Sequence, residues 1–385
     1  MATIYFDNNA TTAVAPEVAE AMRPFLGPRY GNASSIHQFG GAVRRDIEKA
    51  RQSVAELVGA DPQEILFTSC GTESDNTAFW SALESGLERR RIITSQVEHP
   101  AVLNVAQFYE KKGYPVTYIG VDKHGNLDME YFHRSLSDDT LLVSLMLANN
   151  ETGVIFPIRE LADLCRSRGV LFHTDAVQAA GKIPLNLHRL GVDYAAFSGH
   201  KFHAPKGIGI MYIRKGAPFV PFMIGGHQEY GRRGGTEAVP YIVAIGKAAE
   251  LAMLHLHEEE LTVTRLRDHL ETRILDEIPK SFLNGDGALR MGNTTNISFE
   301  GIEGESILLL LDEQGICASS GSACTTGSLE PSHVLRAMQV PYQIIHGSLR
   351  LSLSCYNTLD EVNFTVDRLK EIVAHLRSIS PFWKD

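Results

Sequence analysis

The sequence predicts an α/β protein built on an open, mainly parallel sheet, with a second and smaller α/β domain. Between Ile65 and Ile213, short apolar runs alternate with segments of helical periodicity, which is the pattern of a parallel sheet with crossover helices. The run from Thr140 to Ala148 is almost continuously apolar, as expected for a strand that is covered on both faces. From Asn293 onward, strand and helix signals resume more loosely, and this pattern predicts the second domain.

Three helical segments frame this sheet in the sequence. Two are expected before it, over Pro16 to Phe25 and Gly40 to Val58, and the second of these is amphipathic and ends at Gly59. A long helix or helix pair is expected from Tyr241 to about Ile278. Its position predicts that it joins the two domains.

The first strand of the sheet, Ile65 to Thr68, is expected to turn at Gly71 into a helix that begins at Glu73. The backbone N–H groups around Thr72 then lie unpaired at a helix N-terminus, where they can bind a phosphate group. An ordinary helix with Thr72 as its N-cap is the alternative.

Three further strands are expected to end in polar residues. Arg91 to Ser95 is followed by His99, which is either a loop or cap residue or a stacking partner for a flat cofactor. The long apolar run ends in Asn150. Val170 to His173 is followed by Asp175, which is either an N-cap or a carboxylate that meets a cationic ligand group.

The strand Asp193 to Phe197 leads directly into Ser198, His200 and Lys201. A lysine just past an apolar strand end is partly desolvated, which lowers its pKa and makes its amine a nucleophile able to form a Schiff base. A solvated loop lysine is the alternative. The segment Gly207 to Ile213 follows too closely for a crossover helix, so we expect it to pair antiparallel.

The carboxyl ends of parallel strands meet at one edge of a sheet, so these polar residues are expected to lie together. They suit pyridoxal phosphate better than a nucleotide. Lys201 would hold the aldehyde, and Asp175 would pair with the protonated pyridine nitrogen so that the ring works as an electron sink. His99 would stack on the ring, Gln178 would reach its phenolic oxygen, and no metal is needed. The expected phosphate ligands are Thr72, Ser198 and His200.

The composition argues against several other classes of protein. A formal net charge of −10, without any Lys/Arg-rich run, disfavours nucleic-acid binding. No signal peptide and no apolar run of membrane-spanning length stands out, so we expect a cytoplasmic protein. The five cysteines show neither CxxC nor Cys/His ligand spacing, which disfavours a disulfide framework and a structural zinc site.

Two segments are expected to be functional loops. Ala318 to Ser328 consists almost entirely of small residues and carries Cys324, whose thiol on a mobile tether would suit covalent transfer. An incidental loop thiol is the alternative. Gly225 to Thr236 is rich in glycine and arginine, and it either offers donors to an anion or is a flexible surface loop.

Several motifs, in this order, resemble those of the group I cysteine desulfurases of the NifS/IscS class, which are fold-type I, class V pyridoxal-phosphate enzymes. The resemblance covers essentially the whole chain. It rests on Asp7-Asn-Asn-Ala-Thr-Thr12, Asn149-Asn-Glu-Thr-Gly153, His173-Thr-Asp-Ala-Val-Gln178, Ser198-Gly-His-Lys201 with Pro205-Lys-Gly-Ile-Gly209, Arg233-Gly-Gly-Thr236 and Ser320-Gly-Ser-Ala-Cys324.

This resemblance implies a large cofactor-binding domain over residues 15–257, with a mainly parallel seven-stranded sheet. A small domain of residues 1–14 and 258–385 would carry the catalytic cysteine on a loop at about residues 316–330. The implied catalytic residues are Lys201, Cys324 and His99. The implied cofactor ligands are Gly71, Thr72, His99, Asn150, Asp175, Gln178, Ser198, His200, Lys201 and Thr236, with Asn150 and Arg350 near the substrate carboxylate.

The implied reaction removes sulfur from L-cysteine. Lys201 takes the α-proton, the Cys324 thiolate attacks the substrate sulfur, and alanine leaves while a persulfide stays on Cys324. Thr236 would reach the cofactor phosphate of a neighbouring subunit, which implies an obligate homodimer, and an iron–sulfur scaffold protein would accept the sulfur. General and nitrogenase-directed cluster assembly, and cysteine and selenocysteine as substrates, stay open, as do the roles of Asn8, Asn32 and His37.

Two other functions fit the same residues. Another class V enzyme, such as a selenocysteine lyase or an aminotransferase, would share Lys201 and Asp175 without requiring Cys324. A structural or sulfur-carrier protein with a vestigial cofactor site is the second, although the joint presence of Lys201, Asp175 and His99 disfavours it.

Overall fold

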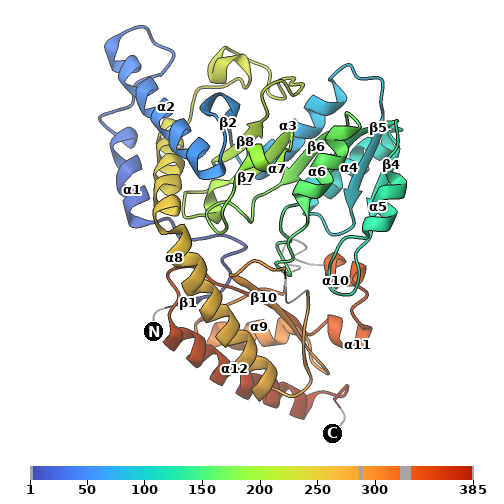
Figure 1. Cartoon of the computed structure of the whole chain (residues 1–385). Helices are drawn as coiled ribbons and strands as arrows, with labels where there is room; N and C mark the ends of the chain where they lie inside the picture. The colour runs from blue at the N-terminus through green and yellow to red at the C-terminus, as the bar shows by residue number, and fades with distance from the viewer. Residues whose placement is uncertain (1–2, 286–288, 321–330, 384–385) are drawn as a thin grey trace.

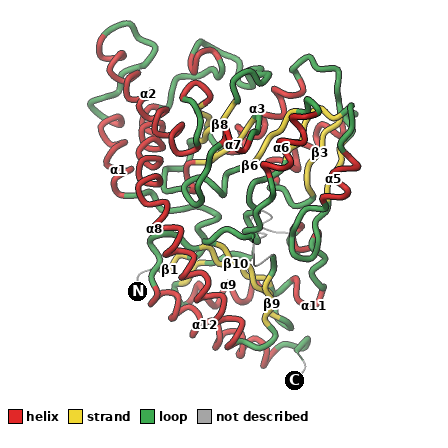
Figure 2. Tube along the Cα trace, in the orientation of Figure 1, coloured by secondary structure: helices red, strands yellow, loops and turns green. Residues whose placement is uncertain are grey.

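The computed structural model describes residues 3–285, 289–320 and 331–383, and Figure 1 shows an upper and a lower part. The upper part is built on a seven-stranded sheet and the lower part on a three-stranded sheet. Figure 2 shows that loops fill most of the zone between the two sheets. The predicted α/β architecture, with a larger and a smaller sheet, is confirmed.

The large sheet is mainly parallel, with strand order β2-β8-β7-β6-β5-β3-β4. β8 pairs antiparallel with both β2 and β7, as predicted from its short connection, and the other pairs are parallel. The strands are β2 (Ile65–Thr68), β3 (Arg91–Ser95), β4 (Val116–Ile119), β5 (Thr140–Ser144), β6 (Leu171–Asp175), β7 (Tyr194–Ser198) and β8 (Gly209–Ile213).

Two details of this sheet differ from the sequence analysis. β4 was not among the expected strands, because it is short and half-buried and so lacks a strong apolar signal. β5 ends at Ser144 rather than Ala148. Residues 145–148 remain buried, and a single bridge joins Ala148 to Ile155. Leu145 N and Leu147 N still donate to the carbonyl oxygens of His173 (3.1 Å) and Asp175 (2.9 Å) of β6. The apolar run that predicted a longer strand therefore reflects both burial and continued hydrogen bonding to β6.

Alternate side chains of each strand enter separate cores on the two faces of the sheet. In β2, Ile65 and Phe67 belong to one core and Leu66 to the other. The Leu66 face is covered by α3 (Gly71–Leu83) and α4 (Pro100–Lys111). The opposite face is covered by α1 (Pro16–Met22), α2 (Gln38–Val58), α5 (Met129–Ser135), α6 (Ile158–Ser167), α7 (Leu187–Leu190) and the first half of α8 (Val239–Glu277).

The lower part has its own core around an antiparallel sheet. β10 (Thr294–Phe299) lies between β9 (Ser281–Leu283) and β12 (Ser348–Ser352). Phe6 from the N-terminus joins this core, and β1 (Ile4–Tyr5) pairs with β11 (Ile316–Cys317). The helices of this part are α9 (Gly304–Glu313), α10 (His333–Ala337), α11 (Tyr342–Ile345) and α12 (Leu359–Ile379).

Helix α8 is a single helix of 39 residues that runs through both parts, from α2 above to α12 below (Figure 1). The boundary predicted between residues 257 and 258 falls inside it, and that division of the chain stays a prediction. Within the described residues, Val239–His257 is long and apolar enough to cross a membrane, which corrects the expectation that no run is. In this structure the stretch packs against α1 and α2.

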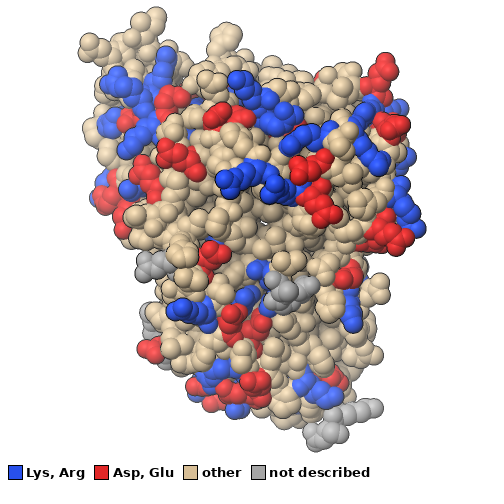
Figure 3. All heavy atoms as spheres, viewed as in Figure 1, with Lys and Arg blue, Asp and Glu red and all other residues tan. Residues whose placement is uncertain are grey.

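Charged side chains of both signs intermingle on the molecular face in Figure 3. The described residues of that face form no stripe of a single sign. The expectation that the chain does not bind nucleic acid stays a prediction.

We expect Gly246→Ala to destabilise the fold, although alanine has the better helix propensity. A Cβ at position 246 of α8 would lie 2.5 Å from the Cβ of Ala50 in α2, so the two helices would have to separate. The overpacking should cost about 1–3 kcal/mol. Thermal midpoints test this, with Gly41→Ala in α2 as the matched control, because a Cβ there meets nothing within 4 Å. Equal stabilisation of both variants would contradict the prediction.

Candidate active site

One cavity of about 360 Å³ gathers residues from the carboxyl ends of β3, β5, β6 and β7 and from the start of α3. Thr236 does not line it, and Cys324 lies outside the described residues. The sequence-predicted residues that line it are Gly71, Thr72, His99, Asn150, Asp175, Gln178, Ser198, His200, Lys201 and Arg350. Their common location supports the predicted convergence, while their individual roles stay predictions.

Lys201 enters the cavity from a single 3-10 turn, Gly199–Lys201, that directly follows β7. Its Nζ donates hydrogen bonds to the carbonyl oxygens of Asn9 (2.5 Å) and Ala10 (2.8 Å). Gly199 permits this turn because a Cβ there would lie only about 3.0 Å from Ile208. The amine is therefore held at a fixed point by the N-terminal segment.

Asp175 ends β6 and is buried, with Oδ1 accepting from Val177 N (2.9 Å). Burial raises the pKa of Asp175, while His99 and Lys201 act in the opposite direction. A cation in the cavity would stabilise the charged form of such a buried carboxyl group. The protonated nitrogen of a pyridine ring is such a cation.

His99 is a cap residue, as one of the two interpretations held, while its stacking on a cofactor stays a prediction. It is the N-cap of α4, with Nδ1 accepting from Ala101 N (3.1 Å), and its ring also lines the cavity. Burial lowers the pKa of His99, and the charge of Lys201 adds to this. The ring is therefore neutral, and it carries its proton on Nε2 because Nδ1 accepts a hydrogen bond.

The start of α3 forms an anion cradle, and it differs in one respect from the prediction. The helix begins at Gly71 rather than Glu73, so Thr72 lies in the first turn and the alternative of an N-cap at Thr72 is wrong. The N-cap, Cys70, makes no side-chain cap hydrogen bond, which leaves first-turn N–H groups for a ligand. A Cβ on Gly71 would approach Val177 to 2.8 Å, so glycine is needed there.

His200 lies beside this cradle and is a neutral donor or acceptor. Its Nδ1 lies 3.1 Å from Thr11 Oγ1. Burial lowers the pKa of His200 to about 4, and Lys201 contributes to the shift. With Ser198 and the α3 N-terminus, the cavity wall offers uncharged hydrogen-bonding groups where a phosphate would bind.

Lys182 is a site residue that the sequence analysis missed. Its Nζ donates to Gln178 Oε1 (2.8 Å) and contacts Asn9 Oδ1 (3.3 Å), while Gln178 Nε2 donates to the Asn9 carbonyl (3.0 Å). Burial lowers the pKa of Lys182 to about 7, and Lys201 and Arg350 add to the shift. The four-residue spacing from Gln178 was the available signal, and Lys182 fixes the orientation of that amide.

Arg350 reaches the cavity from β12 in the lower part of the molecule. Its Nη2 forms an ion pair with Asp7 Oδ1 (2.7 Å), and its Nη1 donates to the Asn150 carbonyl (3.0 Å). Its Nε has no hydrogen-bond partner among the described residues. A buried guanidinium with an unused donor is suited to a ligand carboxylate.

A second layer of buried acids surrounds Asp175. Asp75 of α3 lines the cavity, and its Oδ1 lies 3.4 Å from Nε2 of the buried His173. Burial and the neighbouring Asp175 raise the pKa of Asp75, while burial lowers the pKa of His173 to about 3. Both shifts favour the uncharged forms, so burial opposes an accumulation of negative charge in the site.

The arginine-rich loop is held by carboxylates of the chain itself. Arg233 forms an ion pair with Glu73 of α3 (2.9 Å), and Arg51 of α2 forms a buried pair with Glu229 (2.7 Å). Thr236 is exposed at the end of this loop. The segment is thus anchored at two points, and Thr236 is not among the residues that line this chain's own cavity.

Taken together, the cavity fits pyridoxal phosphate on the basis of its own residues. It offers an amine on a fixed turn, a buried carboxyl that lacks a full counter-charge, and a helix N-terminus kept open by Gly71. No group among the described lining residues conflicts with a planar, anionic ligand of this size.

We expect Glu98→Gln to change the pH dependence of stability. Glu98 is fully buried, and burial raises its pKa from 4.5 to about 8. The folded chain therefore keeps a proton that the unfolded chain loses, so wild-type stability falls as the pH rises through this window. The variant should gain roughly 2 kcal/mol relative to wild type between about pH 6 and about pH 8.

Thermal midpoints of both proteins across this pH range measure the effect. Glu88→Gln, at an exposed position, is the control and should track the wild type. A difference between Glu98→Gln and wild type that stays constant with pH would contradict the assignment of a buried, protonated carboxyl.

Comparison with known proteins agrees with this site. The family model of class-V aminotransferases matches residues 4–364. A cysteine desulfurase of Trichormus azollae is 56% identical over 385 residues, covering 100% of this chain and 96% of that protein. A solved NifS-like protein superposes with a TM-score of 0.91 at 40% identity, covering 97% of this chain and 100% of the other. The structure of SspA in complex with cysteine has a TM-score of 0.81 at 32% identity, covering 92% and 100% of the two chains. The family model covers most of the chain, and the relative from Trichormus azollae aligns with all of it. The chain therefore belongs to the class-V aminotransferase family and, within it, to the cysteine desulfurases of the NifS class.

Proposed function

We propose that this chain is a pyridoxal-phosphate-dependent cysteine desulfurase, which converts L-cysteine to L-alanine and leaves the sulfur as a persulfide on Cys324. The observation that carries the proposal is the convergence of Lys201, Asp175 and Arg350 in one cavity. The full-length likeness to a protein named cysteine desulfurase, and the likeness to a structure that contains cysteine, support the same reaction.

The cavity residues hold the cofactor through complementary contacts. Asp175 would pair with the ring nitrogen, and His99 would lie against the ring face. The first turn of α3, with Ser198 and His200, would bind the phosphate, and Thr236 of a second subunit would complete that contact. When bound, pyridoxal phosphate supplies an electron sink for the bonding electrons released at the substrate α-carbon.

Lys201 is placed to hold and move a proton. Its Nζ is fixed by the Asn9 and Ala10 carbonyls, so small movements of this amine exchange those contacts for contacts to a ligand. Arg350 would bind the substrate carboxylate beside Asn150. This contact would orient the α-proton toward Lys201 and leave the substrate thiol free to react.

Cys324 would complete the reaction as a nucleophile. Its thiolate attacks the substrate sulfur, the carbon–sulfur bond breaks, and the bonding electrons return to the substrate carbon, which becomes that of alanine. The new sulfur–sulfur bond remains on Cys324. His99, neutral and protonated on Nε2, is a proton donor within the same cavity.

We further propose an obligate homodimer that transfers the sulfur to an iron–sulfur scaffold protein in the cytoplasm. The exposed Thr236, which does not line the cavity of its own chain, supports a role in a neighbouring site. Cys70, Cys165 and Cys317 form no disulfide among the described residues, which suits a reducing compartment. Sedimentation of the full chain measures the assembly, and a single-subunit species would exclude the shared site.

Replacing Cys324 tests the reaction class. We expect Cys324→Ala to keep the absorbance of the bound cofactor while alanine formation falls at least about a hundredfold, because the sulfur acceptor is missing. Lys201→Ala should lose both the absorbance of the bound cofactor and alanine formation. Cys317→Ser is the matched control and should behave like wild type. A fully active Cys324→Ala variant would favour a lyase or an aminotransferase.

Replacing Arg350 by lysine tests the carboxylate contact. Lysine keeps the charge but loses the planar array of donors, so the KM for L-cysteine should rise about tenfold or more with a smaller change in kcat. Steady-state alanine formation measures both constants. Arg273→Lys on the surface of α8 is the control. An unchanged KM would remove Arg350 from the substrate site.

A further inference from the structure

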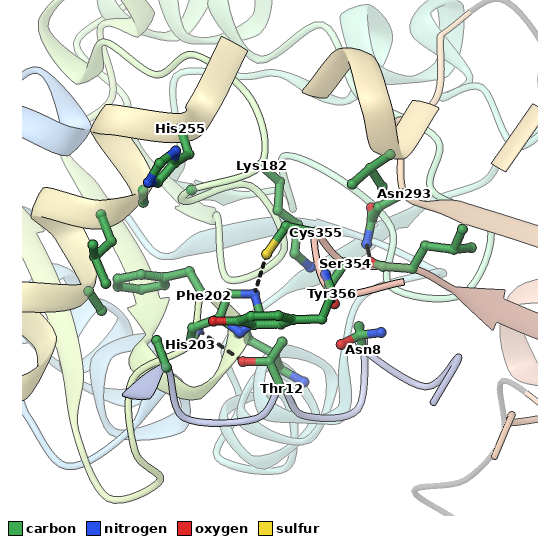
Figure 4. Close-up of a pocket in the computed structure, with 18 of the residues that line it drawn as sticks. Asn8, Thr12, Lys182, Phe202, His203, His255, Asn293, Ser354, Cys355 and Tyr356 are labelled. Carbon is green, nitrogen blue, oxygen red and sulfur yellow. Dashed lines mark hydrogen bonds between the residues drawn. The ribbon is translucent and has the colours of Figure 1, made fainter. Parts of the chain in front are cut away.

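A second cavity, of about 510 Å³, shares Lys201 with the active-site cavity. Figure 4 shows its residues, which come from the N-terminal segment, from the loop that follows Lys201, from α8 and from the segment after β12. The proposed reaction does not use this cavity. It nevertheless contains a thiol and an imidazole side by side, on Cys355 and His203.

Cys355 and His203 form an arrangement typical of a nucleophile and its base. Cys355 Sγ lies 3.9 Å from His203 Nε2 (Figure 4). The opposite ring nitrogen, Nδ1, lies 2.9 Å from the carbonyl oxygen of Ala13. Because a carbonyl only accepts hydrogen bonds, Nδ1 carries the proton of the neutral ring, and Nε2 presents its lone pair to the thiol.

The imidazole is held in this orientation from several sides. His203 has a positive φ of 67°, which a side chain of this kind rarely adopts. Its backbone N–H donates to Thr12 Oγ1 (2.9 Å), and its carbonyl accepts from Ala15 N (3.1 Å). The ring also packs edge to face against Tyr356, with centroids 5.0 Å apart. These contacts place Nε2 at a fixed position beside Cys355.

Charge and exposure both favour a reactive thiol at this position. Burial lowers the pKa of His203, and Lys182 adds to the shift, so the ring is a neutral base near pH 7. The other charged or titratable groups that line the cavity are Lys201, Glu17 of α1, and His255 and Glu260 of α8. Cys355 is exposed, whereas Cys165 is buried and burial raises its pKa to about 12.

We propose that Cys355 and His203 form a second sulfur-accepting site, in which the Cys355 thiolate takes sulfane sulfur from a persulfide. If the donor is the Cys324 persulfide, this inference rests on the proposed function. If the donor is a small-molecule persulfide, it does not. His203 Nε2 first takes the thiol proton. The thiolate then attacks the outer sulfur of R–S–SH, the old sulfur–sulfur bond breaks, and a Cys355–S–SH persulfide forms. The leaving thiolate receives the proton from His203, so no oxidant is required.

The first experiment measures the thiol itself in the cofactor-loaded, full-length Cys324→Ala protein. Alkylation of each cysteine by iodoacetamide is followed by mass spectrometry at several pH values. At neutral pH, Cys355 should react roughly tenfold faster than Cys317, because His203 can take the proton of the Cys355 thiol while burial raises the pKa of Cys317. His203→Asn should abolish this difference.

Asparagine is the matched substitution at position 203. It tolerates the left-handed backbone and can donate to the Ala13 carbonyl, yet it cannot take a proton from the thiol. Cys355→Ser provides a second variant at the other partner. If the Cys355 rate matched that of Cys317 and did not respond to His203→Asn, the paired thiol and base would be refuted.

The second experiment separates the two sources of sulfur. Incubating Cys324→Ala with a low-molecular-weight persulfide should place one extra sulfur on Cys355, independently of the proposed reaction. Incubating wild type with L-cysteine should do the same if the Cys324 persulfide is a donor. Labelling in the first arm alone supports the site with a small-molecule donor, and labelling in both arms supports both donors.

Two results would count against the proposal and would differ from a failure of the proposed function. Absence of sulfur on Cys355 in both arms, while the free persulfide labels another cysteine, would overturn the second site. If wild type formed no alanine while the small-molecule arm still labelled Cys355, the proposed function would fail and the second site would stand.

Discussion

The two hydrogen bonds from Lys201 to the carbonyls of Asn9 and Ala10 tie the large sheet to the lower part of the molecule. The same N-terminal segment is fixed to β12, where Asn9 N donates to Ser352 Oγ (2.9 Å). It also follows the Lys201 turn, since Thr12 N donates to the His200 carbonyl (2.9 Å). A segment with no regular structure thus determines how far the amine lies from β12, the strand that carries Arg350. The site is consequently a product of both cores, and neither part of the chain would form it alone.

The buried carboxyl groups around this segment are stabilised more by protonation, which removes their charge, than by ion pairs. Burial raises the pKa of Glu151 to about 7, and its Oε2 accepts from Ser332 Oγ (2.5 Å). Burial likewise raises the pKa of Glu98 to about 8 and raises that of Asp75. Ionising all of these carboxyls in a dry interior would cost far more than their hydrogen bonds return. Asp175 differs because the charge of Lys201 acts to lower its pKa. It also faces a cavity that a cationic ring nitrogen can enter.

Much of the fold was predictable because it follows from local patterns. Strand ends such as that of β7 are marked by the change from apolar to polar residues, and topology alone brings those ends together. The sequence analysis placed the start of α3 too late. The first turn is stabilised by the preceding loop, where Ser69 N donates to Glu73 Oε2 (2.7 Å), and not by an N-cap at Thr72. Asn9 was missed because its partners lie far along the chain, and the four-residue spacing of Lys182 from Gln178 gave no sign of the contact between Lys182 and Asn9. No single-sequence pattern reports a hydrogen bond across 173 residues.

β12 and the segment that directly follows it deliver side chains to the two cavities. Arg350 lies within β12 and enters the active-site cavity, while Cys355 follows five residues later and lies in the second cavity. Five residues of extended chain span at most about 18 Å. Arg350 and the second thiol are therefore close neighbours along one backbone. Lys201 borders both spaces, and its anchor at Asn9 and Ala10 lies in the same N-terminal segment that supplies Thr12 and Ala13 to His203. A movement of this segment would therefore shift both the Lys201 amine in one cavity and the His203 imidazole in the other.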